Sequence, residues 1–201
     1  MKVLLLGYAA SPVNMMMQRA GDEVIATSAK IDEKFLDVYK PEFLVSHGYG
    51  FILKENILSR FPCKAINLHP SWLPWNRGSD PDFWSLFDDT PKGVSIHYMS
   101  PVIDGGDIIA REAVGVEEGD TLRTYYDRLR EVMCGLFGKN WKAIRSGECG
   151  SFQQESGGSY HRAVDKEPFM GLLEDGFDTP VGKIMEYGRG WRLGKVSGGK
   201  K

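Results

Sequence analysis

The sequence is short of several features that would define its class. It has only three cysteines, Cys63, Cys134 and Cys149, an odd number without a CxxC pair. This spacing argues against a disulfide framework and against a zinc site, so we expect free thiols. No apolar run reaches the roughly 18 residues of a membrane span, and the first apolar stretch is too short for a signal peptide. Together these absences predict a cytoplasmic protein in a reducing compartment.

A strong excess of either charge is also missing. The 201 residues include 25 Lys or Arg and 27 Asp or Glu, a net charge of −2, which argues against a generic nucleic-acid binder. Six of the basic residues but only one acidic residue fall within residues 180–201, so the rest of the chain is acidic. We expect this basic end, which closes with residues 197–201, to be a solvated terminus.

Short apolar runs alternate with helix-length polar stretches, a pattern typical of strand–helix–strand units and a parallel sheet. Strands are expected over six segments, residues 3–6, 24–27, 43–46, 65–68, 92–98 and 108–114. The fifth alternates in polarity and is expected to be half exposed, and apolar residues at helical spacing predict a long helix over 121–145. We therefore expect an α/β fold, a Rossmann-like open, mostly parallel sheet with flanking helices, over residues 1–147. Residues 148–201 are expected to form an irregular extension.

The dinucleotide-binding fingerprint GxGxxG is absent after the first strand, so the site is expected at the carboxyl ends of other strands. The fourth strand ends in Asn67-Leu68-His69-Pro70. In an extended segment the side chains of Asn67 and His69 point to the same side, which brings an amide and an imidazole together. The loop 101–107 carries Asp104 followed by two glycines, which allow a tight turn toward them. The alternative for His69 is a structural histidine whose ring is hydrogen-bonded to a backbone carbonyl. The alternative for the loop with Asp104 is a simple turn.

Three segments together resemble the folate-dependent formyltransferases, a family that includes glycinamide ribonucleotide transformylase and methionyl-tRNA formyltransferase. They are residues 46–53 (SHGYGFIL), 67–74 (NLHPSWLP) and 103–108 (IDGGDI). Residues 73–94 further resemble a subgroup with sugar N-formyltransferases and the formylation domain of linear gramicidin synthetase. The resemblance implies the formyltransferase fold and the catalytic residues Asn67, His69 and Asp104.

The resemblance also implies binding residues. No metal is expected, because the sequence has no clustered His, Cys or Asp at metal-ligand spacing. The pterin of 10-formyltetrahydrofolate, the formyl donor, would contact Phe51, Ile52, Leu53, Leu58, Ser100, Pro101, Val102 and Ile103. The amine substrate would contact Trp75, Arg77, Asp80 and His97, although a structural turn is an equal alternative for the first three. A late segment, residues 153–161, also resembles the family. Its His161 is open between a substrate contact and a structural role.

The activity implied is formyl transfer to a primary amine, in which Asn67 and a protonated His69 donate to the developing oxyanion. Asp104 would support the charged imidazole or accept a proton from the amine. An amino-sugar nucleotide is the expected substrate, and an amino acid or a carrier-bound aminoacyl amine is the alternative. A hydrolase that releases formate from the same cofactor and a non-enzymatic folate binder are weaker alternatives.

Two departures from the family narrow the partners. The first turn lacks the phosphate loop of the purine enzyme, which argues against glycinamide ribonucleotide. Roughly 50 residues follow the long helix, too few for the tRNA enzyme's C-terminal barrel. Neither nucleic acid nor a membrane is therefore expected as a partner, whereas a carrier protein and a homo-oligomer are left open.

Overall fold

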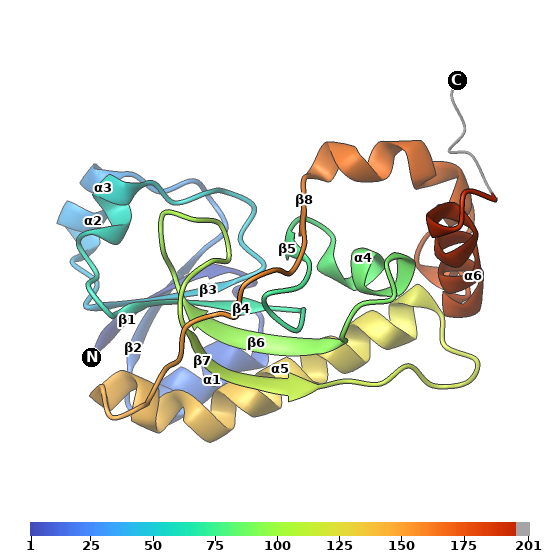
Figure 1. The fold of residues 1–201 in the computed structure, drawn as a ribbon. Helices are drawn as coiled ribbons and strands as arrows, with labels where there is room; N and C mark the ends of the chain where they lie inside the picture. Colours follow the sequence, from blue (N-terminus) through green and yellow to red (C-terminus); the bar gives the residue numbers. More distant parts are fainter. Residues whose placement is uncertain (196–201) are drawn as a thin grey trace. The chain divides into compact units, whose positions relative to one another are not determined.

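The structure of the chain is a computed structural model, and it describes residues 1–195 (Figure 1). The basic end at residues 180–201 was expected to be a solvated terminus, but its first part forms helix α6 (Val181–Arg192) with buried residues, and residues 196–201 lie outside the described residues. Along the chain the helices and strands are β1 (Lys2–Gly7), α1 (Pro12–Arg19), β2 (Glu23–Thr27), α2 (Glu33–Tyr39), β3 (Phe43–His47), α3 (Glu55–Leu58), β4 (Ala65–His69), β5 (Arg77–Gly78), α4 (Pro81–Phe87), β6 (Gly93–Tyr98), β7 (Ile108–Ala113), α5 (Leu122–Ser146), β8 (Tyr160–His161), the 3-10 helices η1 (Ala163–Leu173) and η2 (Gly176–Asp178), and α6 (Val181–Arg192). Within the described residues, no helix is long and apolar enough to cross a membrane.

Two compact units divide the chain, and each is assembled from several stretches of it. The first unit comprises Met1–His69, Ser95–Arg111 and Met133–Gln154. The second unit comprises Pro70–Val94, Glu112–Val132 and Glu155–Lys201. The chain therefore passes from one unit to the other at the end of β4, within β6, β7 and α5, and again after Gln154. The boundary expected between residues 147 and 148 stays a prediction.

A six-stranded sheet in the order β2-β1-β3-β4-β6-β7 forms the framework of the fold. Strands β2, β1, β3 and β4 run parallel, and β6 runs antiparallel to β4. All six strands expected from the sequence are present, and the predicted Rossmann-like, mostly parallel sheet is confirmed. The expected long helix is also confirmed, since α5 spans Leu122–Ser146.

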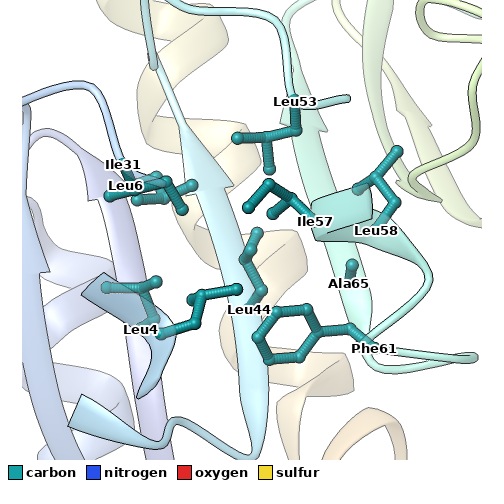
Figure 2. Close-up of a cluster of buried hydrophobic side chains, with 10 residues drawn as sticks. Leu4, Leu6, Ile31, Leu44, Leu53, Ile57, Leu58, Phe61 and Ala65 are labelled. Carbon is teal, nitrogen blue, oxygen red and sulfur yellow. The ribbon is translucent and has the colours of Figure 1, made fainter. Parts of the chain in front are cut away.

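The first unit buries apolar side chains on both faces of its sheet, which is why β1 and β3 read as continuous apolar runs. One face packs against α2, α3 and their flanking turns (Figure 2). This core cluster comprises Leu4, Leu6, Ile31, Leu36, Leu44, Leu53, Ile57, Leu58, Phe61 and Ala65. On the other face the ring of Phe43 meets Trp141 of α5 edge-on, with centroids 5.3 Å apart. Each such side chain contributes about 1.5–3 kcal/mol when fully buried, so the sheet has a firm core on both sides.

The expectation of a half-exposed strand at residues 92–98 is wrong. Residues 93–97 of β6 are all buried, and Ser95 and His97 are 0% and 2% exposed. β6 is an inner strand, between β4 and β7, so its polar side chains face the protein interior instead of water. Alternating polarity marks two different faces, but it does not say that the polar face is solvated.

The second unit is built around α4, the first part of α5, η1 and α6. Its centre is aromatic: the rings of Phe83 and Phe87 are stacked at 5.5 Å, and Phe87 lies 4.5 Å from Phe169 of η1. Residues 163–192 were expected to be irregular and are instead mostly helical. On α6 the buried residues Val181 and Ile184 are three positions apart and form the apolar stripe of the helix. The glycines around them hide this stripe in the sequence.

A buried carboxylate holds the start of α5. The Asp120 side chain is 4% exposed and accepts hydrogen bonds from both Nη atoms of Arg128, at 2.8 and 2.6 Å. It also accepts from Thr124 Oγ1 at 2.8 Å and from the Glu117 backbone N–H at 2.7 Å. The hydrogen bonds from Arg128 hold the pKa of Asp120 well below its usual range, against the opposing effect of burial. This carboxylate therefore contributes to stability only while it is ionised.

Candidate active site

Two neighbouring strands and one loop of the first unit bring four polar side chains together. The antiparallel pairing of β4 with β6 places Asn67 opposite His97. His69 ends β4, on the same side as Asn67. The loop of residues 99–107, here named the Asp104 loop, turns back from the end of β6 until Asp104 reaches Asn67. Local strand geometry therefore supplies three of the groups, and the loop supplies the fourth.

One carboxylate is shared by an amide and two imidazoles. Asn67 Nδ2 donates to Asp104 Oδ1 at 3.1 Å and lies 3.3 Å from His97 Nε2. His69 Nδ1 is 3.7 Å from Asp104 Oδ2, and His97 Nε2 is 3.4 Å from Asp104 Oδ1. His97 Nδ1 is 2.8 Å from the carbonyl oxygen of Tyr98, so this nitrogen carries a hydrogen. In the neutral ring, Nε2 of His97 is then an acceptor for Asn67, and it can donate to Asp104 only when the ring is protonated.

These groups lie in a largely water-excluded place. The side chains of His69, His97 and Asp104 are 6%, 2% and 11% exposed. Charge interactions are stronger at such burial than at the surface, so the carboxylate can stabilise a positive imidazole next to it. The structure thus gathers Asn67, His69 and Asp104, whose catalytic roles stay predictions. His97 is buried against Asn67 and Asp104, and its direct contact with an amine also stays a prediction.

Exposed apolar side chains lie on two loops of the first unit, the loop after β3 and the Asp104 loop. Phe51 and Ile52 are 45% and 70% exposed and follow β3, whose Ser46 is paired with Asn67. Val102, in the Asp104 loop, is 63% exposed. Adjacent exposed apolar groups around a polar cluster are typical of a ligand site.

The other residues predicted to bind the cofactor lie partly in the buried core and partly in the Asp104 loop. Leu53 and Leu58 are buried in the core cluster, at 7% and 8% exposure, so they lie beneath the loop surface. Ser100 is in the Asp104 loop with Pro101 and Ile103, and its Oγ donates to the Val102 carbonyl at 2.9 Å. Tyr49 connects the loop after β3 to the segment after β2, because its hydroxyl donates to the Ala29 carbonyl at 2.9 Å.

The remaining predicted substrate residues, Trp75, Arg77 and Asp80, belong to the second unit. The backbone N–H of Arg77 donates to the Ser159 carbonyl at 3.0 Å, within the pairing of β5 with β8. Asp80 is ion-paired with Lys166. Their contacts with an amine stay predictions.

His161 of β8 has structural partners within the second unit. Its ring is stacked on Trp84 at 3.9 Å with an interplanar angle of 6°. Its Nε2 is 3.0 Å from Asp88 Oδ2. These contacts favour the structural alternative for this histidine.

Two features of the first unit escaped the sequence reasoning. Ser11, the residue before α1, lies with its Oγ 2.9 Å from Nδ1 of His47, the last residue of β3, and both residues are buried. No periodicity or spacing in the sequence signals this pair. Gln154, noted only as part of a late segment, donates to the backbone of the Asp104 loop. Over residues 1–195 no group of three or more His, Cys, Asp or Glu is arranged to hold a metal ion.

A family model described as formyl transferase matches residues 7–137. The methionyl-tRNA formyltransferase of Caldanaerobacter subterraneus subsp. tengcongensis is 28% identical over 186 residues, which are 90% of this chain and 59% of that protein. The methionyl-tRNA formyltransferase of Finegoldia magna is 32% identical over 136 residues, 66% of this chain and 44% of that protein. The chain therefore spans less than two thirds of the length of these curated relatives.

Among solved structures, the formyltransferase PseJ from Anoxybacillus kamchatkensis aligns with a TM-score of 0.88 and 43% identity, covering 92% of this chain and 97% of PseJ. That crystal structure is a complex with UDP-4,6-dideoxy-4-formamido-L-AltNAc and tetrahydrofolate. A methionyl-tRNA formyltransferase from Clostridium thermocellum aligns with a TM-score of 0.69 at 14% identity, covering 89% of this chain and 78% of that one. At that identity the second likeness concerns the fold alone.

Proposed function

This chain belongs to the formyl transferase family, whose model matches residues 7–137, and we propose that it is a folate-dependent N-formyltransferase acting on a nucleotide-linked amino sugar. The donor would be 10-formyltetrahydrofolate, and the acceptor a primary amine on the sugar. The observation that carries the proposal is the single carboxylate, Asp104, shared by Asn67, His69 and His97 in a largely buried place. Such a set can stabilise an oxyanion and move a proton, which a simple binding site does not need.

The first unit offers a fit for the pterin of the donor. Phe51 and Ile52 present apolar surface on the loop after β3, the strand paired with β4, and Val102 presents apolar surface on the Asp104 loop. The backbone of the Asp104 loop supplies polar groups beside them. A flat heteroaromatic ring with polar edges is suited to this combination of apolar side chains and backbone donors and acceptors.

When bound, the donor would supply the formyl carbon, which would exchange its bond to a folate nitrogen for a bond to the amine nitrogen. His69 turns Nδ1 toward Asp104, so its Nε2 is the nitrogen that can donate to the formyl oxygen as negative charge develops there. Asp104 stabilises the positive imidazole and accepts the proton that the amine loses. The leaving nitrogen takes up one proton, so the overall exchange yields an amide and tetrahydrofolate.

Asn67 needs one rearrangement before it can assist. Its two amide hydrogens face Asp104 Oδ1 and His97 Nε2, at 3.1 and 3.3 Å. To donate to the formyl oxygen, the amide must give up one of these contacts. The contact with His97 is the weaker one, because a charge-assisted hydrogen bond to a carboxylate is roughly twice as strong as a neutral one.

The amino-sugar acceptor rests on the extent of the likeness to PseJ. The 43% identity extends over 92% of this chain and nearly all of PseJ, whereas the tRNA-formylating relative is 28% identical and extends well beyond the match. PseJ is described with a UDP-linked 4-formamido sugar. We therefore propose a UDP-linked 4-amino sugar as the acceptor, ahead of an aminoacyl group on a carrier or a tRNA.

The test is a comparison of acceptors by product mass. Purified protein is incubated with 10-formyltetrahydrofolate and, separately, a UDP-linked 4-amino-4,6-dideoxy sugar, methionyl-tRNA, or no amine. We expect a formamide product from the sugar alone. Formate release at the same rate with and without amine would show a hydrolase instead, and formylation of methionyl-tRNA alone would overturn the sugar assignment. His69→Ala should abolish transfer while tetrahydrofolate still binds, as measured by calorimetry.

A further inference from the structure

The Asp104 loop has a conformation that its own residues do not favour. Asp104 has φ +49°, in the left-handed region that non-glycine residues rarely adopt. A side chain at Gly105 would lie 2.6 Å from Val102 Cγ1, and one at Gly106 would lie 1.9 Å from the Tyr98 carbonyl oxygen. The loop is therefore closely packed against itself and against the end of β6. Contacts with the rest of the first unit can stabilise Asp104 in this uncommon backbone conformation.

Gln154 supplies such a contact from more than 40 residues further along the chain. Its Nε2 donates to the Asp104 carbonyl at 2.7 Å and to the Gly106 carbonyl at 2.8 Å. Both amide hydrogens thus clamp the two carbonyls that flank Gly105. A pair of backbone hydrogen bonds between Ile108 and Phe152, at 2.8 and 3.0 Å, fixes where this segment meets the loop.

We propose that Gln154 is a positioning residue for the reaction, acting through Asp104. This inference rests on the proposed formyl transfer, in which Asp104 handles the charge on His69 and the proton of the amine. The side chain of Gln154 holds the backbone of Asp104 and leaves the carboxylate available to Asn67, His69 and His97. A second donor–acceptor pair fixes rotation as well as distance, and an error of about 1 Å in a reacting group can cost 10²-fold in rate.

Two variants and one control separate this role from simple structural support. Gln154→Met keeps the length of the side chain and removes both donors. Gln154→Glu keeps the shape, but its carboxylate faces two carbonyls until protonation returns one donor. Gln153→Met is the matched control, because Gln153 is the same residue type at the neighbouring, exposed position.

We expect Gln154→Met to lower kcat about 10- to 100-fold, while KM for the acceptor and the melting temperature stay close to wild type. The activity of Gln154→Glu relative to wild type should rise as the pH falls, while that of Gln154→Met stays flat. If Gln154 were merely structural, its replacement would lower the melting temperature and the fraction of active protein, and the two variants would show the same pH dependence. An unchanged kcat, or a fall equal to that of Gln153→Met, would overturn the proposal.

The dependence on Asp104 is tested by combining substitutions. If Gln154 acts through that carboxylate, Gln154→Met should cost little further kcat in an Asp104→Asn background. Equal factors in both backgrounds would show that Gln154 acts independently of Asp104 and would contradict the proposal.

A measurement without substrates keeps this inference apart from the proposed function. Backbone amide exchange in residues 99–107, followed by mass spectrometry, should accelerate in Gln154→Met and not in Gln153→Met. Should the wild-type protein formylate no amine while this difference persists, the proposed function fails and the clamp on the loop stands. Unchanged exchange in Gln154→Met would refute the clamp itself.

Discussion

Replacing Asp104 by asparagine tests the electrostatic part of the mechanism with almost no change in shape. The carboxylate Oδ2 is 3.7 Å from His69 Nδ1, and both side chains are about nine-tenths buried. At this separation and an effective dielectric constant of about 20, the attraction for an imidazolium is about 4 kcal/mol. The neutral amide loses this attraction, and it can turn its NH₂ toward His69, which then must accept a hydrogen bond instead of donating one.

We therefore expect Asp104→Asn to lower kcat/KM by up to about 10³-fold, since each 1.36 kcal/mol is a factor of ten. Steady-state formylation of the amino-sugar acceptor measures the loss, and the melting temperature reports whether the fold is intact. Asp107→Asn is the matched control, because it makes the same change three residues away in the same loop. The control should keep kcat/KM within about threefold of wild type. The role given to the Asp104 carboxylate would be refuted if folded Asp104→Asn did the same.

Two further predictions concern the donor site and the stability of the second unit. Phe51→Ser should weaken tetrahydrofolate binding, measured by calorimetry, about 5- to 30-fold, because the Phe51 ring is 45% exposed and its surface is available to a ligand. Phe177→Ser is the control, because Phe177 is similarly exposed at 47%. Equal affinities of the two variants for tetrahydrofolate would contradict the placement of the donor. Asp120→Asn should lower the free energy of unfolding by about 1–3 kcal/mol near neutral pH, since it removes a charged acceptor of Arg128. The low pKa of Asp120 makes this stabilisation complete above the unfolded value of about 3.9, and it should decline as the pH falls below that value toward the folded pKa. Denaturant melts across pH, with the exposed Asp127→Asn as control, measure the effect, and a difference that persists unchanged in acid would contradict it.

Much of the first unit could be predicted because its strands carry a local signal. Apolar runs between polar stretches are sufficient to locate strands that are buried on both faces, and β1 to β4 matched closely. Asn67 and His69 were found for an equally local reason, the alternation of side chains along one strand. The same reasoning gave the wrong exposure for β6, because its polar residues Ser95 and His97 face the protein interior instead of solvent.

Contacts between distant parts of the chain were out of reach of that reasoning. The clamp from Gln154 joins residues separated by about 50 positions, and the Ser11–His47 pair joins two buried residues 36 positions apart. Neither leaves a periodicity or a spacing that sequence alone can show. The helical character of residues 163–192 was missed because glycine and proline mask a short stripe of buried residues.

The sequence by itself determined the open sheet, the long helix and the residues that could do chemistry, since each depends on neighbours within a few positions. Only the tertiary structure decided which of those residues meet. Asp104 reaches Asn67 because a strained loop folds back along β6, and the packing of that loop and its hydrogen bonds to Gln154 make this conformation the stable one.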